Sequence, residues 1–209
     1  YFTLLIVQSY GLTKVILNRP YLLKLIFHPF KGTNMKIKKI HHVAYRCKNA
    51  KETVEWYKKY LNMEFVLAIA ENQVPSTKAP DPYMHIFLDA GAGNILAFFE
   101  IPSYPDMSRD LNTPDWVQHL AFELGSMEEQ EEVKAKLEGD GIEVVGPTDH
   151  TIFQSIYFFD PSGHRLELAV NTNTSEMDSK LDQVKWEMLN KWEKTKIAPE
   201  HARWMHEKT

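Results

Sequence analysis

Hydrophobic and polar residues alternate over residues 40–47, and a helical pattern follows directly. Asn49, with Glu52 three positions later, is typical of a helix start in which side chains cap free backbone N–H groups. Apolar residues then recur with helical spacing as far as Leu61. The pattern therefore predicts a strand followed by an amphipathic helix.

The same pattern recurs in the second part of the chain. Residues 117–124 alternate, and Ser126 with Glu129 three positions later forms a second capping pattern. The helical spacing that follows ends at Gly139 and Gly141, residues that favour a helix C-terminus. A second strand and helix are therefore predicted.

Both predicted strands carry a histidine, His42 or His119, seven positions before the capping residue. The residues that follow match in type: Val-Ala-Tyr-Arg-Cys in the first strand and Leu-Ala-Phe-Glu-Leu in the second. Because side chains alternate between the two faces of a strand, the apolar residues would pack on the helix and the histidine would point away from it. His41 would then lie on the opposite face from His42, as a structural residue.

Three strand-like segments follow each predicted helix, so both halves have the order βαβββ. We predict an α+β fold in which two tandem βαβββ modules form a partly open, barrel-like, metal-binding cleft, plus a C-terminal helical tail. A fusion of two similar modules explains such a repeat better than a solenoid does. The predicted segments are residues 65–70, 84–88 and 95–101 in the first half, and 143–145, 155–159 and 165–170 in the second.

These elements divide the chain into five parts. In the tail, Leu181, Val184, Met188 and Trp192 have the spacing of an amphipathic helix, which we expect to serve packing or dimerisation. The predicted parts are a leader or upstream segment at 1–34, a first module at 35–104, a linker at 105–116, a second module at 117–170 and the tail at 171–209.

The charges of the chain are evenly mixed. Lys and Arg number 24, Asp and Glu number 28, and the formal net charge at pH 7 is -4. No basic stripe interrupts this mixture, so we expect no nucleic-acid partner. Cys47 is the only cysteine, which excludes an intrachain disulfide and is typical of a reducing compartment. We therefore expect a buried, inert thiol in a cytoplasmic protein.

Residues 1–34 differ from the rest, because they contain basic residues and no acidic ones. This composition resembles an organellar transit peptide, or upstream sequence translated by accident. We favour the accident, because Met35 precedes the first well-patterned segment. Lys14, Arg19 and Pro20 interrupt the apolar stretch before it reaches the ~18 residues of a membrane span, so we expect no membrane insertion.

The last strand of each module carries one acidic residue in apolar surroundings, Glu100 or Glu167. A carboxylate placed in this way is costly unless it faces water, a polar partner or a metal. His42, His119, Glu100 and Glu167, duplicated by the repeat, therefore form a coherent set of metal ligands. Imidazole and carboxylate together suit Fe(II), Mn(II), Zn(II), Ni(II) or Co(II), and two histidines with one carboxylate form the ligand set of non-haem iron oxygenases.

The paired strands and their glutamates resemble the vicinal oxygen chelate superfamily, over residues 36–170. This superfamily includes glyoxalase I, methylmalonyl-CoA epimerase, metal-free antibiotic-binding proteins such as those of bleomycin resistance, fosfomycin-inactivating transferases and type I extradiol dioxygenases. The resemblance implies the fold, a divalent-metal site and a small-molecule substrate, and it is compatible with a homodimer. Retention of both histidines and Glu167 argues against the metal-free binders.

Residues 146–167 are similar to the last part of catechol 2,3-dioxygenases. In that family a tyrosine ten residues before the glutamate ligand, and a histidine upstream of it, line the substrate pocket. Tyr157 and His150 occupy the matching positions, so the resemblance implies catalytic roles for both. It also favours Fe(II) or Mn(II) over Zn(II), Ni(II) or Co(II) as the metal.

Three functions follow from these observations. The first is an extradiol ring-cleaving dioxygenase-like enzyme that acts on a catechol-like small molecule. The second is a glyoxalase I-like or epimerase-like lyase or isomerase that acts through a metal-bound enediolate, and Glu100 supports it because those relatives have a fourth ligand there. Asn94 also departs from the dioxygenases, which usually have a histidine at that position, and His85 is the nearest substitute. The third is a non-catalytic small-ligand-binding protein.

Overall fold

The computed structural model describes residues 6–9, 12–15, 37–108, 111–198 and 200. The chain divides into two compact units, Tyr1–Lys38 and Lys39–Thr209. In the first unit, β1 (Ile6–Ser9) pairs antiparallel with β2 (Leu12–Val15). The prediction that residues 1–34 are a leader or upstream segment lies largely outside the described residues.

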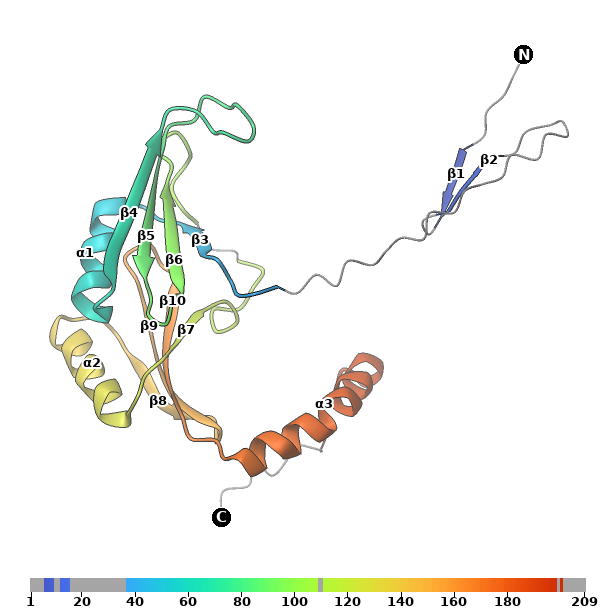
Figure 1. Cartoon of the computed structure of the whole chain (residues 1–209). Coiled ribbons are helices and arrows are strands. Elements are labelled where there is room, and N and C mark those ends of the chain that lie inside the picture. The colour runs from blue at the N-terminus through green and yellow to red at the C-terminus, as the bar shows by residue number, and fades with distance from the viewer. Residues whose placement is uncertain (1–5, 10–11, 16–36, 109–110, 199, 201–209) are drawn as a thin grey trace, which may run out of the picture. The chain divides into compact units, whose positions relative to one another are not determined.

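The second unit contains two four-stranded sheets that do not close on each other (Figure 1). Both have the same topology, with strand orders β3-β6-β5-β4 and β7-β10-β9-β8. In each sheet the strand that comes first in the sequence pairs in parallel with the one that comes last, β3 with β6 and β7 with β10. The predicted α+β fold with two βαβββ modules and a C-terminal helix is confirmed. The first module consists of β3 (Val43–Arg46), α1 (Ala50–Leu61), β4 (Glu64–Glu71), β5 (Tyr83–Asp89) and β6 (Ile95–Glu100). The rest consists of β7 (Leu120–Glu123), α2 (Met127–Gly139), β8 (Val145–Asp149), β9 (Phe153–Phe159), β10 (Arg165–Asn171) and α3 (Ser175–Thr195).

The two predicted helix starts are confirmed in atomic detail. The Asn49 side chain accepts a hydrogen bond from the Glu52 backbone N–H at 2.9 Å, and the Ser126 side chain accepts one from the Glu129 N–H at 3.2 Å. Each bond satisfies a backbone donor that has no partner within its helix. The matching caps explain why both helices begin at the same distance from their strands.

The position of one strand was predicted wrongly. The first strand after the second helix was expected at residues 143–145, but β8 spans Val145–Asp149 and pairs with β9 through an irregular register. Gly146 has a φ of +112°, and a Cβ atom there would lie 2.6 Å from the Ser155 carbonyl oxygen. A glycine is therefore needed for β8 to approach β9 so closely, and alternation of apolar residues does not reveal this.

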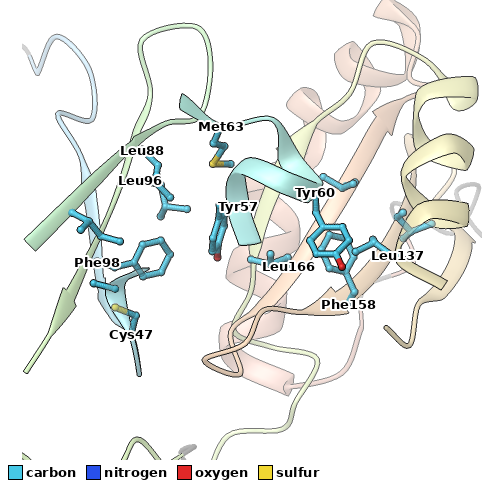
Figure 2. Close-up of a cluster of buried hydrophobic side chains, with 14 residues drawn as sticks. Cys47, Tyr57, Tyr60, Met63, Leu88, Leu96, Phe98, Leu137, Phe158 and Leu166 are labelled. Atoms are coloured by element: carbon cyan, nitrogen blue, oxygen red, sulfur yellow. The ribbon is translucent and has the colours of Figure 1, made fainter. Parts of the chain in front are cut away.

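One hydrophobic core joins the two modules, and α1 contributes to both sides of it (Figure 2). The Tyr57 ring lies 5.2 Å from the Phe98 ring of the first sheet, and Trp56 lies 6.1 Å from Phe158 of the second, measured between ring centroids. Cys47 is buried in the same core, and burial raises the pKa of its thiol to about 11. The expectation of a buried thiol is therefore confirmed, and the raised pKa disfavours the reactive thiolate.

Polar contacts between the modules surround the turn that joins β9 and β10. The buried Tyr57 hydroxyl donates to an Asp160 carboxylate oxygen at 3.1 Å, and the second oxygen accepts from the His164 backbone N–H at 2.8 Å. The Lys48 N–H donates to the Ser162 hydroxyl at 3.1 Å. The turn that begins at Asp160 therefore holds the first module against the second.

We expect Asp160→Ala to destabilise the protein by about 3 kcal/mol, because it leaves the buried Tyr57 hydroxyl and the His164 N–H without this acceptor. Asp160→Asn is the matched variant, since an amide can serve both groups. Urea unfolding of the wild type and both variants measures the difference. Equal stability of the alanine variant and the wild type would contradict the role of this carboxylate.

The same comparison predicts a pH dependence. Burial raises the pKa of Asp160 in the folded protein above its value in the unfolded chain. The carboxyl group therefore contributes stability that is fully present at pH values below the unfolded-state pKa. This contribution is lost as the pH rises through the folded-state pKa. The free energy of unfolding of the wild type should therefore fall relative to that of Asp160→Asn over this range. Parallel pH profiles for the two proteins would show that Asp160 does not titrate in this way.

The helix α3 has no buried side chain, although it is 21 residues long. Trp186, Leu189 and Trp192 are 68%, 55% and 46% exposed. Of the predicted stripe, Leu181, Val184 and Met188 are half-buried and only Trp192 is exposed. Trp186 and Leu189 lie outside that stripe, so the described part of the chain leaves other apolar side chains of α3 uncovered. None of the helices among the described residues is long and apolar enough to cross a membrane.

Candidate metal centre

His119 and Glu167 lie together on the face of the second sheet that points away from α2. Glu167 is paired in register with Ala121 of β7 and with Tyr157 of β9. Leu166 and Leu168, its neighbours in β10, point into the core, so alternation places the Glu167 side chain on the opposite face. His119 directly precedes β7, where it reaches the same face.

The contacts of His119 determine which ring nitrogen carries its proton. Its Nδ1 lies 3.1 Å from the Val117 carbonyl oxygen, which can only accept a hydrogen bond, so Nδ1 donates. Its Nε2 then points at a Glu167 carboxylate oxygen 2.9 Å away. With the proton on Nδ1, both Nε2 and the Glu167 oxygen are acceptors, and at this distance they need a shared proton or a cation between them. A ligating histidine whose other nitrogen donates to a carbonyl is a common feature of metal sites.

The buried Glu167 carboxylate has a supporting set of hydroxyl groups. Its second oxygen accepts hydrogen bonds from the Ser155 hydroxyl and from the Tyr157 hydroxyl, the latter at 3.1 Å. These donors leave the oxygen that faces His119 available for a cation. The donor set therefore fits a divalent metal, for which His119 and Glu167 would supply one nitrogen and one oxygen.

Tyr157 and His150 are in contact, as their predicted roles require. The His150 Nε2 lies 2.8 Å from the Tyr157 hydroxyl oxygen, and this hydroxyl in turn donates to Glu167. Burial, and then the charge of Glu167, raise the pKa of Tyr157. The phenol therefore stays protonated near neutral pH and can donate a hydrogen bond.

His42 lies on the corresponding face of the first sheet, in a group of histidines. Its Nδ1 is 2.8 Å from the Nδ1 of His41, and its ring centroid is 6.1 Å from that of His85. The expectation that His41 lies on the opposite face was wrong, because β3 begins only at Val43 and strand alternation does not extend to the two histidines.

His85 has an unsatisfied polar atom. The residue is 9% exposed and stacks on Phe99 at 3.6 Å between ring centroids, and its Nε2 has no hydrogen-bond partner among the described residues. Burial, and then the proximity of His42, lower the pKa of His85, so the ring is neutral near neutral pH. A buried nitrogen without a partner is costly, so this atom is available to a further hydrogen-bonding group.

Glu100 does not join these groups, and the expected grouping of Glu100 with His42 is corrected. In the first sheet Ala97 of β6 pairs with Ala44 of β3, and in the second sheet Glu167 of β10 pairs with Ala121 of β7. Ala97, rather than Glu100, therefore occupies the position in the first module that Glu167 occupies in the second. Glu100 instead lies on the helix side of the sheet, where it accepts a hydrogen bond from the Ala50 N–H at 2.5 Å. Its carboxylate stabilises the N-terminus of α1, where the helix dipole favours a negative charge.

The structure does not bring the two histidines together into one site. Among the described residues, no three histidine, cysteine, aspartate or glutamate side chains lie close enough to hold one metal ion. His119 and Glu167 form one partial site and His42 lies in another. Each module of a single chain thus presents only part of the predicted ligand set.

Sequence reasoning missed two side chains beside Glu167. Ser155 lies two residues before Tyr157 in β9, and Arg165 lies two residues before Glu167 in β10, with its guanidinium carbon 4.2 Å from the centre of the Tyr157 ring. Alternate residues of a strand share a face, so this spacing from residues already singled out could have revealed both.

Comparison with known proteins gives the family. The model of the glyoxalase/bleomycin resistance protein/dioxygenase superfamily matches residues 39–168. The chain belongs to this superfamily. The matched range includes every candidate metal ligand and both modules except the end of β10, whereas α3 lies beyond it.

Solved structures of this superfamily are similar to the chain. A glyoxalase family protein from Enterococcus faecalis is 31% identical, with a TM-score of 0.48, and the match covers 65% of this chain and 99% of that one. A glyoxalase family protein from Bacillus cereus is 10% identical, with a TM-score of 0.56, over 68% and 99% of the two chains. A variant of the fosfomycin resistance protein FosX from Listeria monocytogenes, solved with Mn(II) and a dihydroxypropylphosphonic acid, is 22% identical, with a TM-score of 0.47, over 69% and 100%.

Proposed function

We propose that this superfamily member is a mononuclear metal-dependent enzyme whose metal is held by His42, His119 and Glu167. The observation that carries the proposal is the opposition of His119 Nε2 and a Glu167 oxygen at 2.9 Å, with the other His119 nitrogen engaged by a carbonyl. A cation between these atoms removes the conflict between two acceptors. Fe(II) or Mn(II) is the favoured metal, and Zn(II), Ni(II) and Co(II) suit the same donors.

A second copy of the chain would complete the site. His42 of one copy would meet His119 and Glu167 of the other, since the described residues of one chain do not group these ligands. Two further features support a homodimer. The Nε2 of His85, beside His42, has no partner among the described residues, and Trp186 and Leu189 of α3 are exposed. Closed two-fold pairing is the commonest assembly of soluble proteins and would give two equivalent sites.

The reaction that this arrangement favours is extradiol ring cleavage of a catechol-like small molecule. With Glu100 committed to α1, the ligands are two histidines and one carboxylate, which leaves positions open for a chelating diol and for O2. The lyase or isomerase alternative loses the carboxylate that supported it. Asn94 stands where these dioxygenases usually have a histidine. Its side chain donates a hydrogen bond to the Gly91 carbonyl at 3.1 Å within a turn, so it has a structural role there.

The metal, when bound, supplies the chemistry that activates O2 toward the diol. The residues of the chain bind and orient the substrate. The Tyr157 hydroxyl would hydrogen-bond a substrate oxygen beside Glu167, and His150, in contact with that hydroxyl, would hold or release a proton. The burial of Tyr157 and Glu167 keeps bulk water from these hydrogen bonds.

The test is anaerobic reconstitution with Fe(II) or Mn(II), followed by a panel of catechols under O2. We expect O2 consumption together with a yellow ring-cleavage product, and a loss of about 100-fold in kcat for Tyr157→Phe. Metal-loaded protein that produces neither colour nor O2 uptake would contradict the dioxygenase proposal. Solvent proton exchange into a hydroxycarbonyl compound without O2 uptake would instead favour the lyase or isomerase.

A further inference from the structure

Arg165 is a cationic side chain next to the candidate metal ligands. It lies two residues before Glu167 in β10, on the same face of the sheet, and is partly buried. Its guanidinium carbon lies 4.2 Å from the centre of the Tyr157 ring. Stacking of this kind orients the planar group.

No carboxylate of the described part of the chain neutralises this guanidinium. Among the residues that the structure describes, no aspartate or glutamate lies within ion-pair distance of Arg165. A partly buried guanidinium offers five N–H donors and binds planar anions through two parallel hydrogen bonds. Contact with one aromatic face leaves most of these donors unused, so the chemistry of Arg165 points to an anionic ligand.

Arg165 also lines a cavity of about 860 Å³ that His119 reaches. Lys48 adds a second positive charge to the lining, and its backbone is held in place by the Ser162 hydroxyl at 3.1 Å. The acidic residue of the lining, Asp115, takes part in an interaction of its own. The balance of charge in the cavity therefore favours an anion.

The same cavity has apolar walls that could hold a ring. Tyr45 and Phe159 both line it and are 39% and 46% exposed. Phe159 is paired in register with Arg165, so the two side chains lie side by side on neighbouring strands. A ligand with an apolar ring and one negative group would cover Phe159 and neutralise Arg165 at the same time.

We propose that Arg165 determines specificity for substrates that carry a carboxylate, so that the diol of the proposed function is a ring-bearing carboxylic acid rather than neutral catechol. The inference rests on the proposed function for the identity of the diol, but the recognition of the carboxylate depends only on Arg165 and its cavity. Lys48 assists as a second cation. Binding of an anion can therefore be tested separately from turnover.

The experiment compares benzoate with its neutral analogue benzamide, by ligand-detected NMR titration of the purified full-length chain, with and without Mn(II). We expect benzoate to bind about 10-fold more tightly than benzamide. Arg165→Gln should abolish this preference, and Arg165→Lys should retain part of it because the charge remains. Lys51→Gln is the matched control, since it removes an exposed charge on α1, and should leave the preference unchanged.

Equal binding of benzoate and benzamide, or an unchanged preference in a folded Arg165→Gln variant, would overturn the inference. Circular dichroism melting curves establish that the variant is folded. A second comparison uses Fe(II)-loaded protein with 3,4-dihydroxybenzoate and catechol. If benzoate is preferred but neither diol is cleaved, the proposed function fails and the carboxylate site stands. If both diols are cleaved with equal kcat/KM, the proposed function stands and the role of Arg165 in specificity fails.

Discussion

The Glu167→Gln variant should lose at least about 100-fold in metal affinity relative to the wild type. The substitution replaces an anionic donor by a neutral amide at the oxygen that lies 2.9 Å from His119 Nε2. Its second oxygen accepts from the Ser155 and Tyr157 hydroxyls, and glutamine retains an oxygen that can serve them. The loss should therefore appear in metal binding more than in folding. Calorimetric titration with Mn(II), together with metal analysis of the purified protein, measures it.

Two other glutamates provide controls for this comparison. Glu138→Gln changes a surface carboxylate paired with Lys134 on α2 and should leave metal affinity unchanged. Glu100→Gln should lower the stability of the α1 N-terminus without affecting metal binding, since this carboxylate faces the Ala50 N–H. A Glu167→Gln variant that binds metal like the wild type would remove this residue from the ligand set. Loss of metal in Glu100→Gln would restore Glu100 to it.

Mixing two inactive variants should restore part of the metal content if the site is shared between copies. His42→Ala and Glu167→Gln chains, each nearly metal-free alone, would form a mixed dimer with one intact pair of modules and one doubly defective pair. Purification through both tags selects mixed dimers, in which one of the two sites is intact, so we expect about half of the wild-type metal content. Co-expression of the two differently tagged chains, followed by metal analysis of the doubly purified protein, measures this.

The control for this experiment is co-expression of His119→Ala with Glu167→Gln. Both changes fall in the second module, so no mixed dimer contains an intact site, and metal content should stay low. Recovery in the first mixture alone would support sites shared between copies. Failure of the first mixture to recover metal, in a protein that light scattering shows to be dimeric, would contradict the shared site.

Much of the fold followed from local patterns. The capping residues Asn49 and Ser126 determined the starts of two helices, because a side-chain acceptor for a free N–H acts within one turn of its own residue. Strand-like runs of residues revealed β9 and β10 for a similar reason, since such a run is recognised from neighbouring residues alone. The position of β8 escaped this reasoning, because the close approach of Gly146 to Ser155 depends on a neighbouring strand.

The candidate site was predictable where it lies on one strand and its immediate neighbours. His119, Glu167 and Tyr157 were singled out by the repeat and by the resemblance, and the structure places them in one hydrogen-bonded group. Glu100 was misassigned because an acidic residue among apolar ones can be stabilised from either side of a sheet. The first turn of α1, rather than a metal, supplies its donor.

The sequence by itself determined the duplicated βαβββ pattern and the membership in the superfamily, and it predicted a metal site of His42, His119, Glu167 and Glu100. These features are local or repeated, so spacing along the chain is enough to show them. Only the tertiary structure decided which face Glu100 occupies and that Arg165 lies beside Tyr157. It also decided that, within the described part of one chain, Arg165 meets no carboxylate and His42 does not join His119. Such relations depend on register, on helix placement and on the packing of the two modules around α1, which connect residues far apart in the sequence.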